Sequence, residues 1–378
     1  MIYLDAAATT LQKTPEVRQA VLRAMETMAS PGRGGHRPAM LAAETAFRCR
    51  CTAAELFHVP QPEQVVFTMN ATHGLNIAIR SLIQAGDRVV VSGYEHNSVM
   101  RPLHLLGAEI RVAGRELFAP EKMAAEFAAL LPGAKAAVCT TMSNVFGYRT
   151  PIEDIAESCR KNGVPLIIDA SQSAGNQELD FEQLMPAFMA MPGHKGLLGP
   201  QGTGLLLCGQ TGIPLMAGGT GSESRNPEMP DYLPDRLEAG THNVAGIAGL
   251  LAGMQWIQRR GCGLLGAEEG NLIRRFGERI EEISGLEVFL SENPDRQGGV
   301  LSVRHRQIDG EYLAEALGNA GVAVRAGLHC APIAHENAGT GETGTVRFSV
   351  SPFNTPEEME QAAEILRKCV KKLSDGIK

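Results

Sequence analysis

Short apolar runs alternate with longer segments of helical periodicity through the first two thirds of the chain. The runs are Val65–Phe67, Arg88–Val91, Ile110–Val112, Ala136–Cys139, Pro165–Asp169, Ala187–Met191 and Gly204–Cys208. Helical patterns precede and separate them, beginning with Pro15–Ala29 and including one that ends at Ile83. Apolar strands that alternate with helices indicate a mainly parallel sheet with both faces covered. We therefore expect an α/β architecture in this region.

The pattern changes after a segment rich in Gly, Ser and Pro at Gly209–Pro234. A long helical region follows at Asn243–Ile283. Beyond it, strand patterns alternate with helical ones, at Val300–Val303, Gly310–Ala320, Val322–Arg325, Val346–Val350 and Pro356–Lys372. This arrangement predicts a smaller α+β domain. We expect a large domain at 15–250 and a small domain at 251–378 that includes 1–14.

Composition excludes several classes of protein. The 378 residues are 44% hydrophobic and 20% charged, as in a globular protein that is not embedded in a membrane. A net charge of -7 argues against a nucleic-acid groove. The longest nearly apolar run, Val244–Met254, is well short of the roughly 20 residues that span a bilayer. Eight scattered cysteines and a start without signal-peptide features favour reduced thiols and a cytoplasmic location.

One apolar run ends in a turn that carries a lysine. Ala187–Met191 leads into Pro192 and Gly193, and His194 and Lys195 follow before further glycines. A lysine that directly follows a buried strand is a candidate for a lowered pKa and for Schiff-base chemistry. The alternative is an ordinary solvated lysine.

Other polar residues follow predicted strands and complement this lysine. The segment around Thr72 begins a helix and could bind an anion, although a simple helix cap is the alternative. Asp169 ends an apolar strand, where a carboxylate needs a cationic partner such as a pyridinium N–H. His96 could stack on a flat ring. An anion site, a carboxylate, a stacking ring and a lysine together indicate a pyridoxal phosphate site.

The chain resembles the cysteine desulfurase and selenocysteine lyase group of class V aminotransferase-fold enzymes over nearly its whole length. The resemblance rests on Tyr3–Thr10, Glu95–Asn97, Ser143–Gly147, Asp169–Gln172, Gly193–Lys195, Glu238–Thr241, Arg325–Cys330 and Arg347–Ser349. It implies the type I fold of pyridoxal phosphate (PLP) dependent aminotransferases. It also implies a homodimer.

The resemblance implies roles for the matching residues. Lys195 would bind the cofactor aldehyde and move a proton at the substrate Cα, with Asp169 at the pyridine nitrogen and Gln172 at the phenolic oxygen. His96 would stack on the ring. The phosphate would be held by the amides of Ala71 and His73, the Thr72 hydroxyl, His194, and Thr241 from a second subunit. Asn144 and Arg347 would bind the substrate carboxylate, and Arg33 and His36 would lie at the entrance.

Cys330 differs from the other cysteines because it lies in a loop, between Gly327 and Pro332, and not in an apolar or helical pattern. Nearby His329 and Arg325 could favour its nucleophilic thiolate form. The resemblance implies that this thiolate takes sulfur from L-cysteine as a persulfide, releases L-alanine, and passes sulfur or selenium to an acceptor protein. A zinc site built from His329, Cys330 and His335 is an alternative without a recognised fourth ligand.

Other functions stay open on the sequence. They are a selenocysteine lyase acting on L-selenocysteine, a transaminase or β-lyase, and a scaffold that binds protein partners. Pro192 stands where relatives usually carry a hydroxyl residue that binds phosphate, and Leu328 stands where they often have histidine. We expect the Gly, Thr and Glu run at Asn337–Gly344 to alter access to the site.

Overall fold

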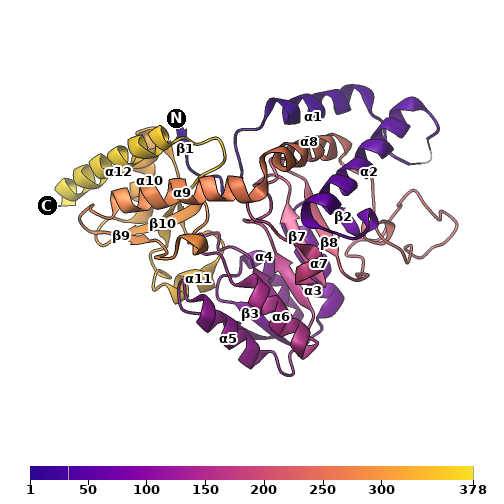
Figure 1. Ribbon diagram of the computed structural model, residues 1–378, viewed down its shortest axis with the longest axis horizontal. Coiled ribbons are helices and arrows are strands. Elements are labelled where there is room, and N and C mark those ends of the chain that lie inside the picture. Colours follow the sequence, from indigo (N-terminus) through magenta and orange to yellow (C-terminus); the bar gives the residue numbers. More distant parts are fainter. Residues whose placement is uncertain (33, 378) are drawn as a thin grey trace.

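The computed structural model describes residues 1–32 and 34–377, and its largest element is a seven-stranded sheet (Figure 1). The strand order is β2-β8-β7-β6-β5-β3-β4. The strands are β2 (Val65–Thr68), β3 (Arg88–Ser92), β4 (Glu109–Ala113), β5 (Ala136–Thr140), β6 (Leu166–Asp169), β7 (Phe188–Pro192) and β8 (Gly204–Cys208). All seven expected strands are therefore present, with ends that shift by at most one residue.

Strand direction brings the loops with functional residues to one edge of this sheet. β3, β4, β5, β6 and β7 pair in parallel, whereas β8 is antiparallel to both β7 and β2. β2 therefore runs in the same direction as β7, and the carboxyl ends of six strands lie at the same edge. In parallel sheets this edge is the usual place for a ligand.

Side chains on successive strand residues enter opposite cores, as the two-residue period of a strand requires. Val89 and Val91 join one hydrophobic cluster and Val90 joins the other. The first face is covered by α3 (Ala71–Leu82) and α4 (Asn97–Leu106). The opposite face is covered by α2 (Arg37–Phe57), α5 (Pro120–Leu130), α6 (Ile152–Asn162), α7 (Phe181–Leu184) and α8 (Val244–Arg260). α1 (Pro15–Thr27) packs along α8 (Figure 1).

The C-terminal part forms a second core around a four-stranded antiparallel sheet, with strand order β12-β13-β10-β9. Its elements are α9 (Cys262–Ile280), β9 (Leu286–Phe289), β10 (Val300–His305), α10 (Gly310–Asn319), β11 (Val322–Ala323), β12 (Arg325–Gly327), α11 (Pro332–Asn337), β13 (Thr345–Ser349) and α12 (Pro356–Ile377). The N-terminal strand β1 (Ile2–Tyr3) pairs with β11, so the start of the chain belongs to this part (Figure 1). Short 3₁₀ helices lie at Pro62–Gln64, Asp235–Leu237 and Pro294–Arg296.

The structure corrects three expectations about individual elements. The helix expected over Asn243–Ile283 is interrupted at Gly261, whose φ of 86° is outside the helical range. The strand expected at Val322–Arg325 is divided between two sheets, since β11 pairs with β1 and β12 pairs with β13. The glycines, prolines and arginines at 30–38 predict a loop, but helix α2 already begins at Arg37, where the His36 side chain accepts a hydrogen bond from the Ala39 amide and caps the helix.

The two cores meet near α9 and around the Cys330 loop. Cys262 and Leu265 at the start of α9 belong to the core of the large sheet, whereas Ile273 belongs to the small core. Ala331 and Ala334, which follow Cys330, also pack into the large-sheet core. The division at 15–250 and 251–378 with 1–14 remains a proposal. Because Ala331 and Ala334 pack into the core of the seven-stranded sheet, the loop that carries Cys330 is anchored on that sheet's side of the molecule.

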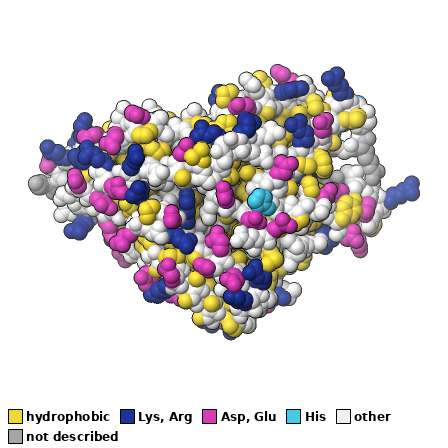
Figure 2. All heavy atoms as spheres, viewed as in Figure 1, with side chains coloured by type: hydrophobic (Ala, Val, Ile, Leu, Met, Phe, Trp, Pro, Cys, Tyr) yellow, Lys and Arg dark blue, Asp and Glu magenta, His cyan; other side chains and the backbone are white. Residues whose placement is uncertain are grey.

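The distribution of surface charge, the character of the helices and the state of the cysteines limit what the protein could bind. Acidic and basic side chains are mixed over the face in view in Figure 2, without a large region of one sign. Within the described residues, none of the helices combines the length and the apolar character that crossing a bilayer demands. All eight cysteines are free.

Candidate active site

A cavity of about 100 Å³ lies at the carboxyl edge of the large sheet. It brings together most of the residues that the sequence indicated, namely Ala71, Thr72, His96, Asn144, Asp169, Gln172, His194 and Lys195. These residues come from the loops after β2, β3, β5, β6 and β7. Segments far apart in the sequence converge here because their strands run in the same direction in one sheet.

Lys195 lies in the turn that follows β7, where burial lowers the pKa of its amine to about 8, although nearby Asp169 opposes the shift. A lysine with this pKa is deprotonated in about one molecule in ten at pH 7, compared with about one in several thousand for an ordinary lysine. Only the neutral amine is a nucleophile. The structure therefore supports the expectation of a reactive lysine.

Asp169 ends β6 with only 3% of its surface exposed. Its Oδ1 accepts a hydrogen bond from the Ser171 amide at 2.9 Å, which fixes the orientation of the carboxylate. Asp169 also acts on Lys195 through its charge. A buried carboxylate of this kind needs a positive partner, and a protonated ring nitrogen would supply one.

The N-terminus of α3 forms part of the cavity wall and corrects one expectation. Asn70 caps the helix, and its Oδ1 accepts the His73 amide at 2.9 Å. The His73 amide is therefore engaged within the protein and is not free for a phosphate. The amides of Ala71 and Thr72 remain available, since residues in a first helical turn have no intrahelical acceptor. The helix dipole adds positive potential at the same place.

Ser98 lines the cavity and was missed by the sequence analysis. Its Oγ lies 2.8 Å from Thr72 Oγ1 and 2.9 Å from His96 Nδ1. The Ser98 amide donates to the same Nδ1 at 3.0 Å, so the His96 proton lies on Nε2. Burial lowers the pKa of His96, which keeps the ring neutral near pH 7. Ser98 was missed because a serine two residues after a histidine has no distinctive pattern.

The N-terminal segment holds the loops that carry Gln172 and His194. Gln172 Nε2 donates to the Ala7 carbonyl at 3.1 Å. His194 Nδ1 lies 3.0 Å from Thr9 Oγ1, and the His194 carbonyl accepts Lys13 Nζ at 2.9 Å. Burial, with the charges of Lys195 and Lys13, lowers the pKa of His194 to about 4. His194 is therefore neutral at pH 7 and can bind an anion only as a neutral donor.

Arg347 on β13 is buried, with 3% of its surface exposed. Its Nη1 donates to the Asn144 carbonyl and its Nη2 to Asp5 Oδ1, each at 3.0 Å. Its Nε is buried and has no hydrogen-bond partner among the described residues. A buried unpaired donor is costly, and a ligand oxygen would satisfy it. Asn144 itself lines the cavity, which links Arg347 to the site.

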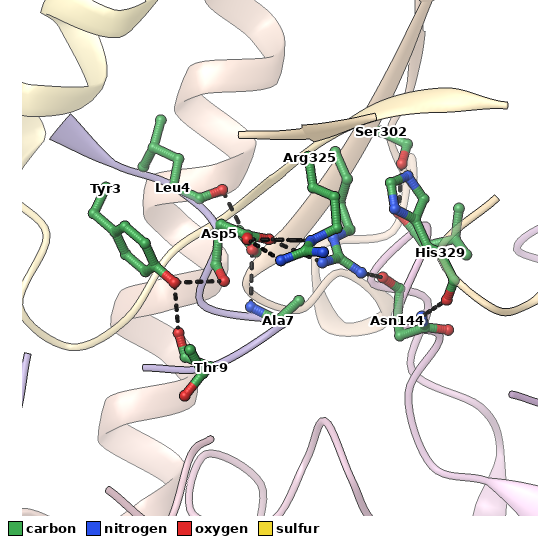
Figure 3. A network of polar contacts seen from close by, with 12 residues as sticks. Tyr3, Leu4, Asp5, Ala7, Thr9, Asn144, Ser302, Arg325 and His329 are labelled. Atoms are coloured by element: carbon green, nitrogen blue, oxygen red, sulfur yellow. Dashed lines mark hydrogen bonds and ion pairs between the residues drawn. The ribbon is translucent and has the colours of Figure 1, made fainter. Parts of the chain in front are cut away.

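Cys330 is exposed in a loop that is tied to the cavity residue Asn144 and to Asn97, the neighbour of the cavity residue His96. The His329 carbonyl accepts Asn144 Nδ2 at 2.8 Å (Figure 3). The Cys330 carbonyl accepts the Asn97 amide at 2.7 Å. Both loop residues have positive φ, 48° for His329 and 57° for Cys330, which costs about 1–2 kcal/mol per residue. These contacts hold the strained loop at the rim of the site.

The electrostatic surroundings of Cys330 differ from the expectation in one respect. Burial, with the charge of Arg347, lowers the pKa of His329 to about 2. His329 is therefore neutral at pH 7 and does not stabilise a thiolate through a charge. Arg325, on β12 directly before this loop, remains as the cation, and its hydrogen bond to Asp5 raises the pKa of its guanidinium.

Three further candidates do not join the cavity. Thr241 lines a separate hollow beside Glu238 and His73. His36 is exposed at the start of α2. Arg33 lies outside the described residues. No group of three or more His, Cys, Asp or Glu is arranged for a metal ion in the described chain.

The residues of the cavity fit pyridoxal phosphate. Free amides and a hydroxyl at the start of α3 suit a phosphate, the Asp169 carboxylate suits a ring nitrogen, and the Lys195 amine suits an aldehyde. Pro192 lines the same cavity but offers neither a hydroxyl nor an N–H group. Donors to the phosphate must therefore come from the start of α3 and from His194.

Comparisons with known proteins agree with this geometry. Residues 2–362 match the family described as Aminotransferase class-V. The chain is 31% identical over 379 residues to a probable cysteine desulfurase of Methanothermobacter thermautotrophicus, covering 97% of this chain and 94% of that protein. It is 30% identical to a probable cysteine desulfurase of Vibrio cholerae, covering 98% and 94%. An apo structure of cysteine desulfurase from Thermococcus onnurineus NA1 matches with a TM-score of 0.89 and 28% identity, covering 98% and 95%.

Proposed function

Because the chain belongs to the class V aminotransferase family, we propose that it is a PLP-dependent cysteine desulfurase. It converts L-cysteine to L-alanine and takes up the sulfur on Cys330 as a persulfide. One observation carries this proposal: an exposed cysteine on a strained loop is hydrogen-bonded to Asn97 and, through His329, to Asn144, at the rim of a cavity that holds Lys195 and Asp169.

The bound cofactor would supply an electron sink that weakens the bonds at the substrate Cα. Ala71, Thr72 and His194 would hold its phosphate, and Asp169 would keep its ring nitrogen protonated. Lys195 would bind its aldehyde carbon. The protein itself contributes position, burial and charge.

The residues around the substrate have separate tasks. Arg347 binds the α-carboxylate through its free N–H groups, and Asn144 orients that guanidinium through its carbonyl. Lys195 Nζ removes and returns the proton at Cα, for which a pKa of about 8 is well suited. His96 keeps its proton on Nε2, because Nδ1 accepts the Ser98 amide.

Sulfur transfer requires a thiolate at Cys330. Its Sγ attacks the sulfur of the bound cysteine, the S–S bond forms, and the bond from that sulfur to the substrate Cβ breaks. The electron pair of the broken bond goes to carbon, which takes up the thiol proton and becomes the methyl group of alanine. One thiolate and one cysteine thus give one persulfide anion and one alanine, with no other oxidant.

Several finer features complete the proposal. A homodimer would bring Thr241 of one subunit to the phosphate of the other. An acceptor protein or small thiol would remove the sulfur from Cys330, whose exposure allows access. The free cysteines support a cytoplasmic location. A selenocysteine lyase is the second candidate, because the same cavity and lysine would serve L-selenocysteine.

Product analysis tests the proposed reaction. The holoenzyme is incubated with L-cysteine or L-selenocysteine, with and without a thiol acceptor, and alanine, 2-oxo acids and released sulfur or selenium are quantified. We expect L-cysteine to give alanine and sulfide in equal amounts when the acceptor is present. A 2-oxo acid in place of alanine would identify a transaminase or β-lyase. Alanine from L-selenocysteine alone would identify a selenocysteine lyase.

Ser98→Ala is expected to weaken cofactor binding. The Ser98 hydroxyl orients Thr72 Oγ1, and losing one such hydrogen bond at an anion site costs about 1 kcal/mol, or roughly fivefold in affinity. The dissociation constant of pyridoxal phosphate is measured by absorbance titration of the apoprotein. Ser98→Thr retains the hydroxyl and serves as the control. Equal affinities for wild type and Ser98→Ala would contradict this role.

A further inference from the structure

Asp5 lies at the centre of a charged cluster that joins the N-terminal segment to β12 and β13 (Figure 3). Its Oδ2 accepts Arg325 Nη2 at 2.8 Å and its Oδ1 accepts Arg347 Nη2 at 3.0 Å. The backbone around it is fixed as well, since the Tyr3 hydroxyl donates to the Asp5 carbonyl and the Ala7 amide donates to Ser349 Oγ. The carboxylate therefore has a defined position between two guanidinium groups.

Strand register explains why a carboxylate is needed there. Arg325 on β12 is directly opposite Arg347 on β13 in an antiparallel pair. Like charges at facing positions repel each other and destabilise the pair. Among the ion pairs of the described residues, Asp5 is the only acidic partner of either arginine. It offsets one of the two positive charges, so the cluster has a net charge of +1.

The two arginines serve different ends of a bound amino acid. Arg347 contacts Asn144 in the cavity wall, and the charges of Arg347 and Asp5 both act on the Lys195 amine. Arg325 is more exposed, at 54% of its side chain, and lies on β12, directly before the loop that carries Cys330. Cys330 must approach the sulfur of the bound amino acid, so Arg325, which directly precedes the Cys330 loop, lies toward the side-chain end of that ligand. Arg347 lies toward its carboxylate end.

Resting on the proposed function, we propose that Asp5 determines substrate specificity by charge. It neutralises Arg325 and leaves one effective positive charge, at Arg347, for the single α-carboxylate of an amino acid with an uncharged side chain. An amino acid with an anionic side chain meets no free cation at that end and is repelled by Asp5. The site thus prefers monocarboxylate amino acids to dicarboxylate ones.

Ligand titrations of charge variants test this proposal. The holoprotein is titrated with L-alanine and with L-aspartate, and binding is followed through the absorption of the bound cofactor, which needs no sulfur transfer. We expect Asp5→Asn to increase the affinity for L-aspartate relative to L-alanine by about fivefold, the size expected for one partly exposed charge. The double variant Asp5→Asn/Arg325→Gln restores the net charge and should return the ratio to the wild-type value.

The single variant Arg325→Gln keeps the buried pair of Asp5 with Arg347, so it tests the proposal even if Asp5→Asn does not fold. We expect it to lower the aspartate-to-alanine affinity ratio, because Asp5 is then less neutralised. A ratio that is the same in wild type and Arg325→Gln, or that rises equally in Asp5→Asn and the double variant, would overturn the proposal. Normal binding of both ligands without alanine formation from L-cysteine would instead contradict only the proposed function.

Discussion

Lys195→Ala is expected to lower kcat/KM for L-cysteine by on the order of 10³-fold or more, the effect of losing a general base together with covalent attachment of the cofactor. The reason is that Lys195 is the cavity residue whose amine is both buried beside Asp169 and shifted to a pKa of about 8. The rate of alanine formation measures the effect. Mass spectrometry after borohydride reduction checks whether the cofactor is still attached.

The control for this variant is Lys122→Ala, which removes an exposed lysine that is paired with Glu116 and does not line the cavity. It should retain wild-type activity and an attached cofactor. Lys195→Ala should keep the fold, which circular dichroism can verify. Covalent cofactor that persists in Lys195→Ala would show that another amine is the point of attachment and would contradict the assignment.

Cys330→Ala is expected to abolish sulfide release from L-cysteine, with a loss on the order of 10³-fold, because the sulfur then has no thiolate acceptor at the rim of the site. The other cysteines cannot replace it. Six of them are buried, and Cys51 is only half-buried on α2. Initial rates of alanine and sulfide formation measure the loss. The mass of the Cys330 peptide in the wild type should increase by one sulfur atom during turnover.

Cys51→Ala is the matched control, since it removes the other cysteine with solvent access. It should leave both rates unchanged. Binding of L-alanine to Cys330→Ala, followed by absorption of the cofactor, should also be retained, because neither Lys195 nor Arg347 is altered. Unchanged turnover of L-cysteine by Cys330→Ala would contradict the role of Cys330 as the sulfur acceptor. Turnover of L-selenocysteine alone by this variant would favour a selenocysteine lyase, in which selenium departs with less help.

Much of the large domain could be predicted from local patterns. Strands such as β3 and β8 are short, mainly apolar and buried on both faces, so their sequences already differ from their helical surroundings. The predictions were wrong where the pattern is ambiguous. Gly261 lies within a continuous helical periodicity, and only its positive φ shows that α8 ends before it. The four residues of Val322–Arg325 look like one strand because pairing partners are not visible in a sequence.

The site could be predicted in part, for a similar reason. Lys195, Asp169, His96 and Thr72 each follow a predicted strand, and parallel strands bring such loops together. The roles of Ser98 and Asp5 could not be predicted. Each acts through a contact between segments that are distant in sequence. Ser98 Oγ contacts the Thr72 hydroxyl, and Asp5 pairs with Arg325 and Arg347, which lie more than 300 positions away.

By itself, the sequence determined the order of strands and helices, the residue types that pyridoxal phosphate chemistry requires, and the one cysteine outside an apolar or helical pattern. Periodicity and strand ends are local properties, so they can be read directly from the chain. Tertiary structure alone decided which donors are free and which charges are cancelled. The His73 amide is occupied by Asn70, burial makes His329 neutral, and Asp5 bridges Arg325 and Arg347. Burial and hydrogen bonding depend on neighbours in space, and these exist only once the chain has folded.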